Sequence, residues 1–285
     1  MAARAHHTND QHQKITALST MTLEQIQETI GAPWQEYRQR YRQEMRSPIA
    51  LLQEVNDYHY HSTSKQLRPL LVLLSAGAVG RPTQVTTVVA VAIELLHNAS
   101  LLHDDVVDDD DERRGKASVR SRWGNHIALL TGDYYLALIM SLLEELHDGH
   151  YAQRLAHTVL EMTEGEMMQQ QMRDHIDLDG YREIVRRKTA SLMSACCALG
   201  AYSSGCQGTD VRCDMESFGM HFGMAFQMRD DLHDSEHDDA PWKNMEKEIA
   251  AERDNEIKQA ITILNLLKSS PYKTCLQELT KILTT

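Results

Sequence analysis

Residues 94–108 read ELLHNASLLHDDVVD, an apolar segment of helical periodicity that ends in three aspartates. A second segment, residues 226–234, reads FQMRDDLHD and ends in an acidic cluster of the same shape. Both clusters have the pattern D-D-x-x-D, formed by Asp104, Asp105 and Asp108 in the first and by Asp230, Asp231 and Asp234 in the second. The repetition predicts two helices whose carboxylates could face each other across a pocket.

The spacing of the aspartates indicates a cation site. Residues four apart lie on one face of an α-helix, about one turn from each other, so Asp104 projects beside Asp108. Asp230 and Asp234 have the same spacing. Paired carboxylates at this separation repel each other unless a cation lies between them, and Mg²⁺ commonly binds through one or two carboxylates together with substrate phosphates. A single cluster is usually a solvated acidic face, whereas two copies in apolar surroundings favour a metal site.

The segment between Pro82 and Pro241 contains no proline and is rich in Ala, Leu, Met, Glu and Gln, which are good helix formers. No part of the chain alternates between apolar and polar residues for long enough to require a strand. We therefore predict an all-α fold, a single-domain helical bundle. The expected helices cover residues 23–43, 49–60, 69–80, 83–108, 129–146, 150–173, 181–203, 213–235, 246–268 and 272–283, and residues 112–116 are expected to form a loop.

Composition and charge restrict the class of protein. Of the 285 residues, 42% are hydrophobic and 25% are charged, and the net charge is −12. Such an acidic balance argues against a nucleic-acid partner. Residues 1–20 are interpreted as a mobile N-terminal tail, and residues 21–285 as one domain. We expect no transmembrane segment, because the nearest apolar run, residues 85–96, is shorter than a membrane span.

The five cysteines are an odd number and form no C-x-x-C pair. This usage is typical of a reducing compartment and argues against a disulfide framework. Cys196 and Cys197 lie in an apolar run, so we interpret them as thiols of the core. Together with the lack of a signal-peptide pattern at the N-terminus, these features predict a cytoplasmic protein.

Basic residues cluster near the acidic segments. Lys65 and Arg68 precede a predicted helix, Arg113 and Arg114 follow the first acidic cluster directly, and Lys188 lies in an otherwise apolar helix. Each alone is most simply a surface charge or a capping residue. Together with two Mg²⁺-type clusters they indicate two anionic ligands, one bridged by metal and the other held by Lys and Arg.

These segments resemble, in order, the motifs of the trans-type isoprenyl (polyprenyl) diphosphate synthases. The first and second acidic segments are similar to the two aspartate-rich motifs of that family, and Lys65–Pro69 resembles its K-x-x-R-P motif. Further matches are LTGDY at 130–134, EGEMMQ at 164–169 and RKTA at 187–190, so that the resemblance is collinear over roughly residues 45–235.

The resemblance implies helices around a deep central cavity, usually in a homodimer, and a chain-elongation reaction. In that reaction an allylic diphosphate (geranyl, farnesyl or geranylgeranyl) ionises, and isopentenyl diphosphate attacks the resulting cation. It implies a site for three Mg²⁺ ions, with Mn²⁺ as a possible substitute. The implied metal-binding residues are Asp104, Asp105, Asp108 and Asp230, with Asp231 and Asp234 acting partly through water.

The resemblance also assigns roles to the other site residues. Arg113 and Lys188 would contact the allylic diphosphate, while Gln227 and Thr189 would orient dipoles toward the developing cation. The residues expected to hold isopentenyl diphosphate are Lys65, Arg68, His97 and Arg114. By this assignment the residues acting directly in catalysis are Asp104, Asp105, Asp108, Lys188, Gln227 and Asp230.

Residues before the first acidic cluster indicate the length of the product. In the family a bulky aromatic residue about five positions before the first aspartate floors the pocket and stops growth early. Here that position is Ala99, next to Ser100, and Leu96 lies one turn further back. A small residue leaves the shaft open, so we expect a long polyprenyl product, such as a quinone side chain.

The chain departs from the family pattern in two places. Residues 63–64 are Thr-Ser where the family usually has paired glycines, and residues 235–246 lack the usual glycine-lysine loop. A lysine for the allylic diphosphate is therefore missing, unless Lys243 or Lys247 substitutes for it.

Two alternatives to an active synthase stay open. One is a non-catalytic or regulatory subunit of a heteromeric prenyl synthase, which the altered loop favours and the two intact acidic motifs oppose. The other is a terpene cyclase, which usually has a different second motif.

Overall fold

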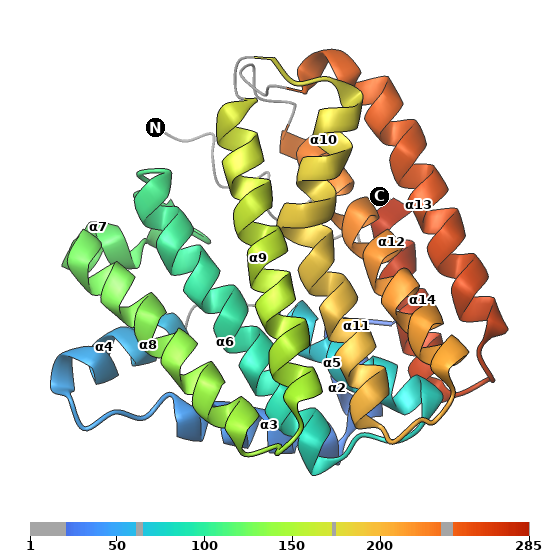
Figure 1. The fold of residues 1–285 in the computed structure, drawn as a ribbon, viewed down its shortest axis with the longest axis horizontal. Coiled ribbons are helices and arrows are strands. Elements are labelled where there is room, and N and C mark those ends of the chain that lie inside the picture. Colours follow the sequence, from blue (N-terminus) through green and yellow to red (C-terminus); the bar gives the residue numbers. More distant parts are fainter. Residues whose placement is uncertain (1–20, 61–64, 173–174, 235–241, 285) are drawn as a thin grey trace.

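Apart from one hairpin of two-residue strands, every regular element that the computed structural model describes is helical (Figure 1). The structure describes residues 21–60, 65–172, 175–234 and 242–284, so the predicted tail 1–20 lies outside the described residues. The elements are α2 (Leu23–Ile30), α3 (Ala32–Glu44), α4 (Ala50–Tyr60), α5 (Leu67–Val79), α6 (Gln84–Val107), β1 (Glu112–Arg113), β2 (Lys116–Ala117), α7 (Val119–Trp123), α8 (Asn125–Glu144), α9 (Gly149–Gln171), α10 (Leu178–Val185), η1 (Arg186–Ala190), α11 (Ser191–Ser203), α12 (Thr209–Asp234), η2 (Lys243–Met245), α13 (Glu246–Leu266), α14 (Pro271–Lys281) and η3 (Ile282–Thr284). The predicted all-α, single-domain fold is confirmed.

Helix α6 forms the centre of the bundle. Thr83 caps its first turn in a capping box with Thr86, and nearly every residue from there to Ala99 is buried. A helix that is apolar on all sides must be covered on all sides, and α3, α5, α8 and α11 pack against it. Because α6 is held rigidly along its length, the aspartates at its carboxyl end have a fixed position.

The two acidic segments end helices that run in the same direction. Helix α11 packs against both α6 and α12 and so joins them. In Figure 1, α6 and α12 both run upward, and their carboxyl ends lie at the same end of the bundle. The expectation from the sequence that the two clusters end comparable helices is therefore confirmed.

Three predictions of local structure were wrong. The expected helix 23–43 is two helices, because Gly31 has φ +67° and interrupts it before Pro33 begins a new first turn. Residues 112–117 form the hairpin rather than a loop, since Arg114 and Gly115 both adopt the positive φ that a two-residue hairpin turn requires. The expected helix 181–203 contains a π-helical turn, η1.

Two described helices, α6 and α8, are long and apolar enough to cross a membrane by length and composition alone, contrary to the expectation that no apolar run reaches that length. Most of the apolar window of α6 (78%) is buried inside the fold, which makes it a core helix, whereas 33% of that of α8 is buried. All five cysteines are free thiols, and Cys196 and Cys197 are fully buried, as the sequence indicated.

Candidate active site

A cavity of about 510 Å³ opens where α6, α9, η1 and α12 meet. Its walls combine charged and apolar side chains. The lining residues that the sequence singled out are Arg68, Leu96, His97, Ala99, Ser100, Asp104, Asp108, Arg113, Lys188, Thr189 and Gln227. The others are Leu101, His103, Asp110, Leu136, Val159, Met162, Thr163, Glu166 and Leu192. The cavity thus gathers residues from segments far apart in the sequence.

The first acidic cluster supplies the anionic wall of this cavity. The pKa of Asp104 is raised to about 6, chiefly by burial and with contributions from the charges of Glu166 and Asp108, against the opposing effect of Lys188. Burial also raises the pKa of Asp108, with Glu166 and Asp110 contributing in the same direction. Burial thus disfavours the charged form of both carboxylates, and a bound cation would favour that form.

Asp105 differs from its two neighbours in the motif. It is 3% exposed, and Arg113 donates a hydrogen bond from Nε to its Oδ1 at 2.7 Å. Arg113 also donates from Nη2 to Asp110 Oδ2 at 2.6 Å, which ties the β1–β2 hairpin to the end of α6. Burial raises the pKa of Asp105 although Arg113 lowers it. Asp105 therefore anchors a cation, Arg113, at the mouth of the cavity.

In the second cluster, each described carboxylate already has a protein partner. Asp230 accepts hydrogen bonds from Arg229 Nη2 at 2.6 Å and Nε at 3.1 Å. Asp231 is 5% exposed and accepts from Tyr181 Oη at 2.6 Å and from Gln227 Nε2 at 2.9 Å. Neither lines the cavity, and the side chain of Asp234 lies outside the described part of the chain. The two clusters are therefore unequal, as the departures in sequence suggested.

Gln227 lies between the second cluster and the cavity. Thr189 donates a hydrogen bond from Oγ1 to Gln227 Oε1 at 2.9 Å, while the amide nitrogen of Gln227 donates to Asp231. Because the amide is held from both ends, its dipole has one orientation. The structure thus joins Thr189 and Gln227 by a hydrogen bond, and both line the cavity.

Lys188 faces the first acidic cluster from η1. It forms an ion pair with Glu166 and donates a hydrogen bond to Gln169 Oε1 at 3.1 Å. No role is predicted from the sequence for Glu166, Gln169 or Tyr181. The first two lie in a segment that matched the family and could have been found there. Tyr181 carries no local signal, since the structure alone brings it to Asp231.

A second basic group lines the same cavity. Arg68 and His97 contact each other at 2.9 Å between Nη1 and Nε2. Burial, followed by the charges of Arg68 and Arg114, lowers the pKa of His97 well below its ordinary value, so His97 is neutral and accepts from the guanidinium. Lys65 and Arg114 are exposed and do not line the cavity.

The apolar part of the cavity begins behind Asp104. Ala99 and Leu96 lie on the same side of α6, with exposed fractions of 1% and 4%, and Ser100 lies beside them. The facing wall is contributed by α8, α9 and α11, through Leu136, Val159, Met162 and Leu192. A hydrocarbon chain fits this chemistry, since no charged side chain is among these residues.

Within the described residues, no three His, Cys, Asp or Glu side chains converge to form a preformed metal cage. Asp104 and Asp108 nevertheless suit a hard divalent cation, because a cation would favour the charged form of Asp104, which burial and then the charges of Glu166 and Asp108 disfavour. Two carboxylates leave most coordination positions open for water and phosphate oxygens, which is how Mg²⁺ is usually bound.

The fold and sequence are similar to those of known proteins. The sequence is 42% identical over 143 residues to heptaprenyl diphosphate synthase component 2 of Geobacillus stearothermophilus, covering 50% of this chain and 45% of that protein. The chain spans about half the length of the curated relatives it matches.

Two solved structures share the fold. A decaprenyl diphosphate synthase from Rhodobacter capsulatus has a TM-score of 0.84 at 24% identity, covering 92% of this chain and 98% of that one. A polyprenyl synthase from Caulobacter crescentus CB15, complexed with calcium and isoprenyl diphosphate, has a TM-score of 0.82 at 23% identity, covering 93% and 98%.

A family model described as polyprenyl synthetase matches residues 49–282, which include both acidic clusters and every predicted site residue. The match, together with an all-α bundle whose cavity joins Asp104, Asp108 and Lys188 to an apolar shaft, leads to one assignment. The chain belongs to the polyprenyl synthetase family.

Proposed function

We propose that this protein is a prenyltransferase that condenses isopentenyl diphosphate with an allylic diphosphate to make a long trans-polyprenyl diphosphate. One observation carries the proposal. A single cavity joins the carboxylates of Asp104 and Asp108 and the ammonium group of Lys188 to an apolar shaft that begins at Ala99. An allylic diphosphate has the same two halves, a strongly charged head and a hydrocarbon tail.

The head of the allylic substrate would lie between Asp104, Asp108 and Lys188. The bound Mg²⁺ ions would neutralise the negative charge that develops on the leaving diphosphate. Lys188 would exchange its contact with Glu166 for one with a diphosphate oxygen, and Arg113, held by Asp105, would approach from the hairpin. Cationic side chains fixed at a site of developing negative charge lower the barrier because they need little reorganisation. Asp230, Asp231 and Asp234 would complete the metal site from the opposite helix.

The carbon cation that forms must be protected from water. Water is kept out by the apolar wall of the cavity, which consists of Leu96, Ala99, Leu136 and Met162. Thr189 and Gln227 line the same cavity and share a hydrogen bond, so their fixed dipoles would stabilise developing positive charge there.

Isopentenyl diphosphate would bind at the second basic group. Arg68, paired with the neutral His97, provides a guanidinium whose direction is fixed, and this suits recognition of a diphosphate. Lys65 and Arg114 carry exposed charges on two segments near this group and would contact the same diphosphate from solvent.

The proposed product is long enough to serve as a quinone side chain. Ala99 adds no bulk at the start of the shaft. Two names support this proposal, because both denote long chains. The Geobacillus relative is named as a component of a heptaprenyl diphosphate synthase, and the Rhodobacter structure is named as a decaprenyl diphosphate synthase.

We also propose that the protein is a cytoplasmic homodimer. Helices α8 and α9 follow each other in the chain, and each exposes large apolar side chains, namely Leu130, Met140, Leu160 and Met167, with exposed fractions of 62–73%. A second copy of this chain would cover them.

The second candidate function is that of one subunit in a heteromeric synthase. The word "component" in the name of the Geobacillus relative favours it, as does the pairing of Asp230 with Arg229. The α8–α9 face would then contact a different chain.

The test is elongation by the purified protein. Incubation with Mg²⁺, isopentenyl diphosphate and farnesyl diphosphate should give polyprenyl products, and Asp104→Asn should abolish them, which excludes a contaminating synthase. Absence of product from the protein alone, with activity restored by a partner chain, would support the subunit function instead.

A further inference from the structure

Three consecutive cations begin the π-helical turn that joins α10 to α11. All three side chains reach α9. Arg186 donates from Nη1 to Glu161 Oε1 at 3.1 Å. Arg187 pairs with Glu164, and Lys188 with Glu166. Successive residues of a regular helix point about 100° apart, so three neighbours that contact one adjacent helix need an unusual backbone or unusually placed acids. This segment has both, and π-helical turns are frequent at functional sites.

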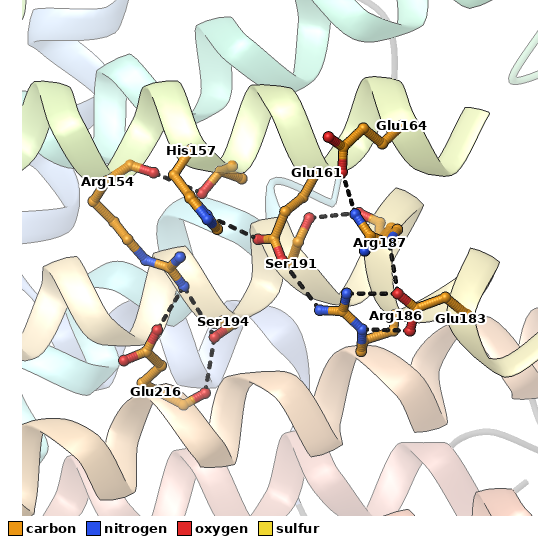
Figure 2. Close-up of polar contacts among 11 residues, drawn as sticks. Arg154, His157, Glu161, Glu164, Glu183, Arg186, Arg187, Ser191, Ser194 and Glu216 are labelled. Atoms are coloured by element: carbon orange, nitrogen blue, oxygen red, sulfur yellow. Dashed lines mark hydrogen bonds and ion pairs between the residues drawn. The ribbon is translucent and has the colours of Figure 1, made fainter. Parts of the chain in front are cut away.

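Glu183, on the last turn of α10, links the first two cations. Its carboxylate accepts hydrogen bonds from Arg186 Nε at 2.7 Å and Nη2 at 2.8 Å, and from Arg187 Nε at 2.5 Å. Figure 2 shows the two guanidinium groups between Glu183 and the carboxylates of Glu161 and Glu164. The hydrogen bonds from Arg186, and then those from Arg187, lower the pKa of Glu183 to about 2 against the effect of burial, so this group is ionised at neutral pH.

Two glycines hold the turn from the sides. A Cβ atom on Gly165 of α9 would lie 2.7 Å from the backbone nitrogen of Lys188, and one on Gly223 of α12 would lie 2.6 Å from Cα of Ala190. The turn is therefore in backbone contact with both neighbouring helices. Packing against the two glycines fixes the position of η1. The carboxylates of Glu183, Glu161 and Glu164 fix the directions of the Arg186 and Arg187 side chains.

Only one of the three cations reaches the cavity. Of the three cations, Lys188 lines the cavity together with Thr189, whereas Arg186 and Arg187 do not. We propose that Glu183 is a positioning residue for prenyl transfer, which holds Arg186 and Arg187 away from the cavity and thereby fixes the π-helical turn that presents Lys188 and Thr189 to the allylic diphosphate. This inference rests on the proposed function of the same cavity.

The expected effect is confined to one substrate. Misplacing a group that binds the reacting diphosphate by about 1 Å can cost up to about 100-fold, so Glu183→Gln should lower kcat/KM for the allylic diphosphate by about 10-fold to 100-fold. The KM for isopentenyl diphosphate should not change, because Arg68 and His97 do not contact η1 in any described hydrogen bond. The amides of residues 186–190 should exchange hydrogen faster in the variant.

Glu216→Gln is the matched control. Glu216 of α12 forms an ion pair with Arg154 of α9 at 2.8 Å, and it has no described hydrogen bond or ion pair with η1 (Figure 2). Both variants would be compared for amide exchange, for the two kinetic constants, and for binding of inorganic diphosphate with Mg²⁺ by calorimetry. A double variant, Glu183→Gln with Arg187→Gln, should lose less than the sum of the single losses, because both changes release the same turn.

The outcomes separate two claims. Weaker diphosphate binding and faster exchange at residues 186–190 in Glu183→Gln, but not in Glu216→Gln, support the positioning role. Equal behaviour of the two variants, or a Glu183→Gln defect that raises both KM values alike, overturns it while leaving the proposed function intact. Wild-type protein that binds diphosphate but forms no product contradicts the proposed function alone.

Discussion

At the scale of single residues, Asp104 shows most clearly that the site is built for a ligand. Its pKa is raised to about 6, first by burial and then by Glu166 and Asp108. Between its ordinary pKa of 3.8 and about 6, the folded protein binds this proton more tightly than the unfolded chain does. The stability of the metal-free protein should therefore fall as pH rises through that window. Above it, the charge of Asp104 destabilises the fold until a cation offsets it.

Asp104→Asn should accordingly stabilise the metal-free protein at pH 7.5. Each pKa unit corresponds to about 1.4 kcal/mol, so the expected gain is about 1 to 3 kcal/mol in the free energy of unfolding, measured by urea denaturation. The gain should disappear at pH 4, where Asp104 is largely protonated in the folded protein. Asp179→Asn, at a carboxylate that is 93% exposed, is the control and should not stabilise. A less stable Asp104→Asn variant at pH 7.5 would show that its charge is already compensated.

Tyr181 is the residue that sequence reasoning missed and that the second cluster needs. Its hydroxyl donates to Asp231, which in turn orients Gln227. Tyr181→Phe removes this donor from a buried carboxylate, which costs about 1 to 3 kcal/mol of stability. We expect kcat to fall with little change in the KM for isopentenyl diphosphate, as steady-state kinetics would measure. A variant with wild-type kcat would mean that Asp231 holds the amide of Gln227 without the hydroxyl of Tyr181.

At the scale of elements, the sequence predicted the helices that follow from the periodicity of apolar residues. Helix α6 ends at its acidic cluster as expected, because its apolar pattern and its capping threonine are local signals. The break at Gly31 and the turn at Arg114 depend on single residues with positive φ, which a periodic pattern does not register. The π-helical turn η1 depends on glycines of α9 and α12, far away in the sequence. The placement of Arg68 beside His97 likewise required the packing of α5 against α6.

Gly165 tests this explanation at the level of the element. An added methyl group would collide with the backbone nitrogen of Lys188 at 2.7 Å, and backbone cannot move aside as a flexible side chain can. Gly165→Ala should therefore lower the thermal midpoint and reduce elongation together. Gly149→Ala is the control, because a Cβ atom there meets nothing within 4 Å. Equal thermal midpoints for the two variants would show that η1 can move away from α9.

At the scale of the whole molecule, α8 and α9 expose several large apolar side chains. Leu130 and Met140 of α8 are 63% and 73% exposed, and Leu160 and Met167 of α9 are 62% and 67% exposed. The sequence predicted a homodimer from the family resemblance, but it did not locate the contact. Only the structure separates the covered side of α8 from its exposed side.

A Leu130→Glu, Met140→Glu double variant should convert a wild-type dimer into a monomer in sedimentation velocity, because two carboxylates would be buried without partners. Leu266→Glu, at an apolar side chain that is 69% exposed on α13, should remain a dimer. A wild-type monomer, or a double variant that is still a dimer, would contradict this assignment of the interface.

The central claim is that the polyprenyl chain grows along the shaft that begins at Ala99. The most direct measurement is the chain length of the products made from farnesyl and isopentenyl diphosphates by the wild-type protein and by Ala99→Phe. Ala99 is 1% exposed and lines the cavity below Asp104, so a phenyl ring there would close the shaft. We predict long-chain products for the wild type and markedly shorter ones for Ala99→Phe at comparable rates of the first condensation. An active variant with the same product distribution as the wild type would contradict the account.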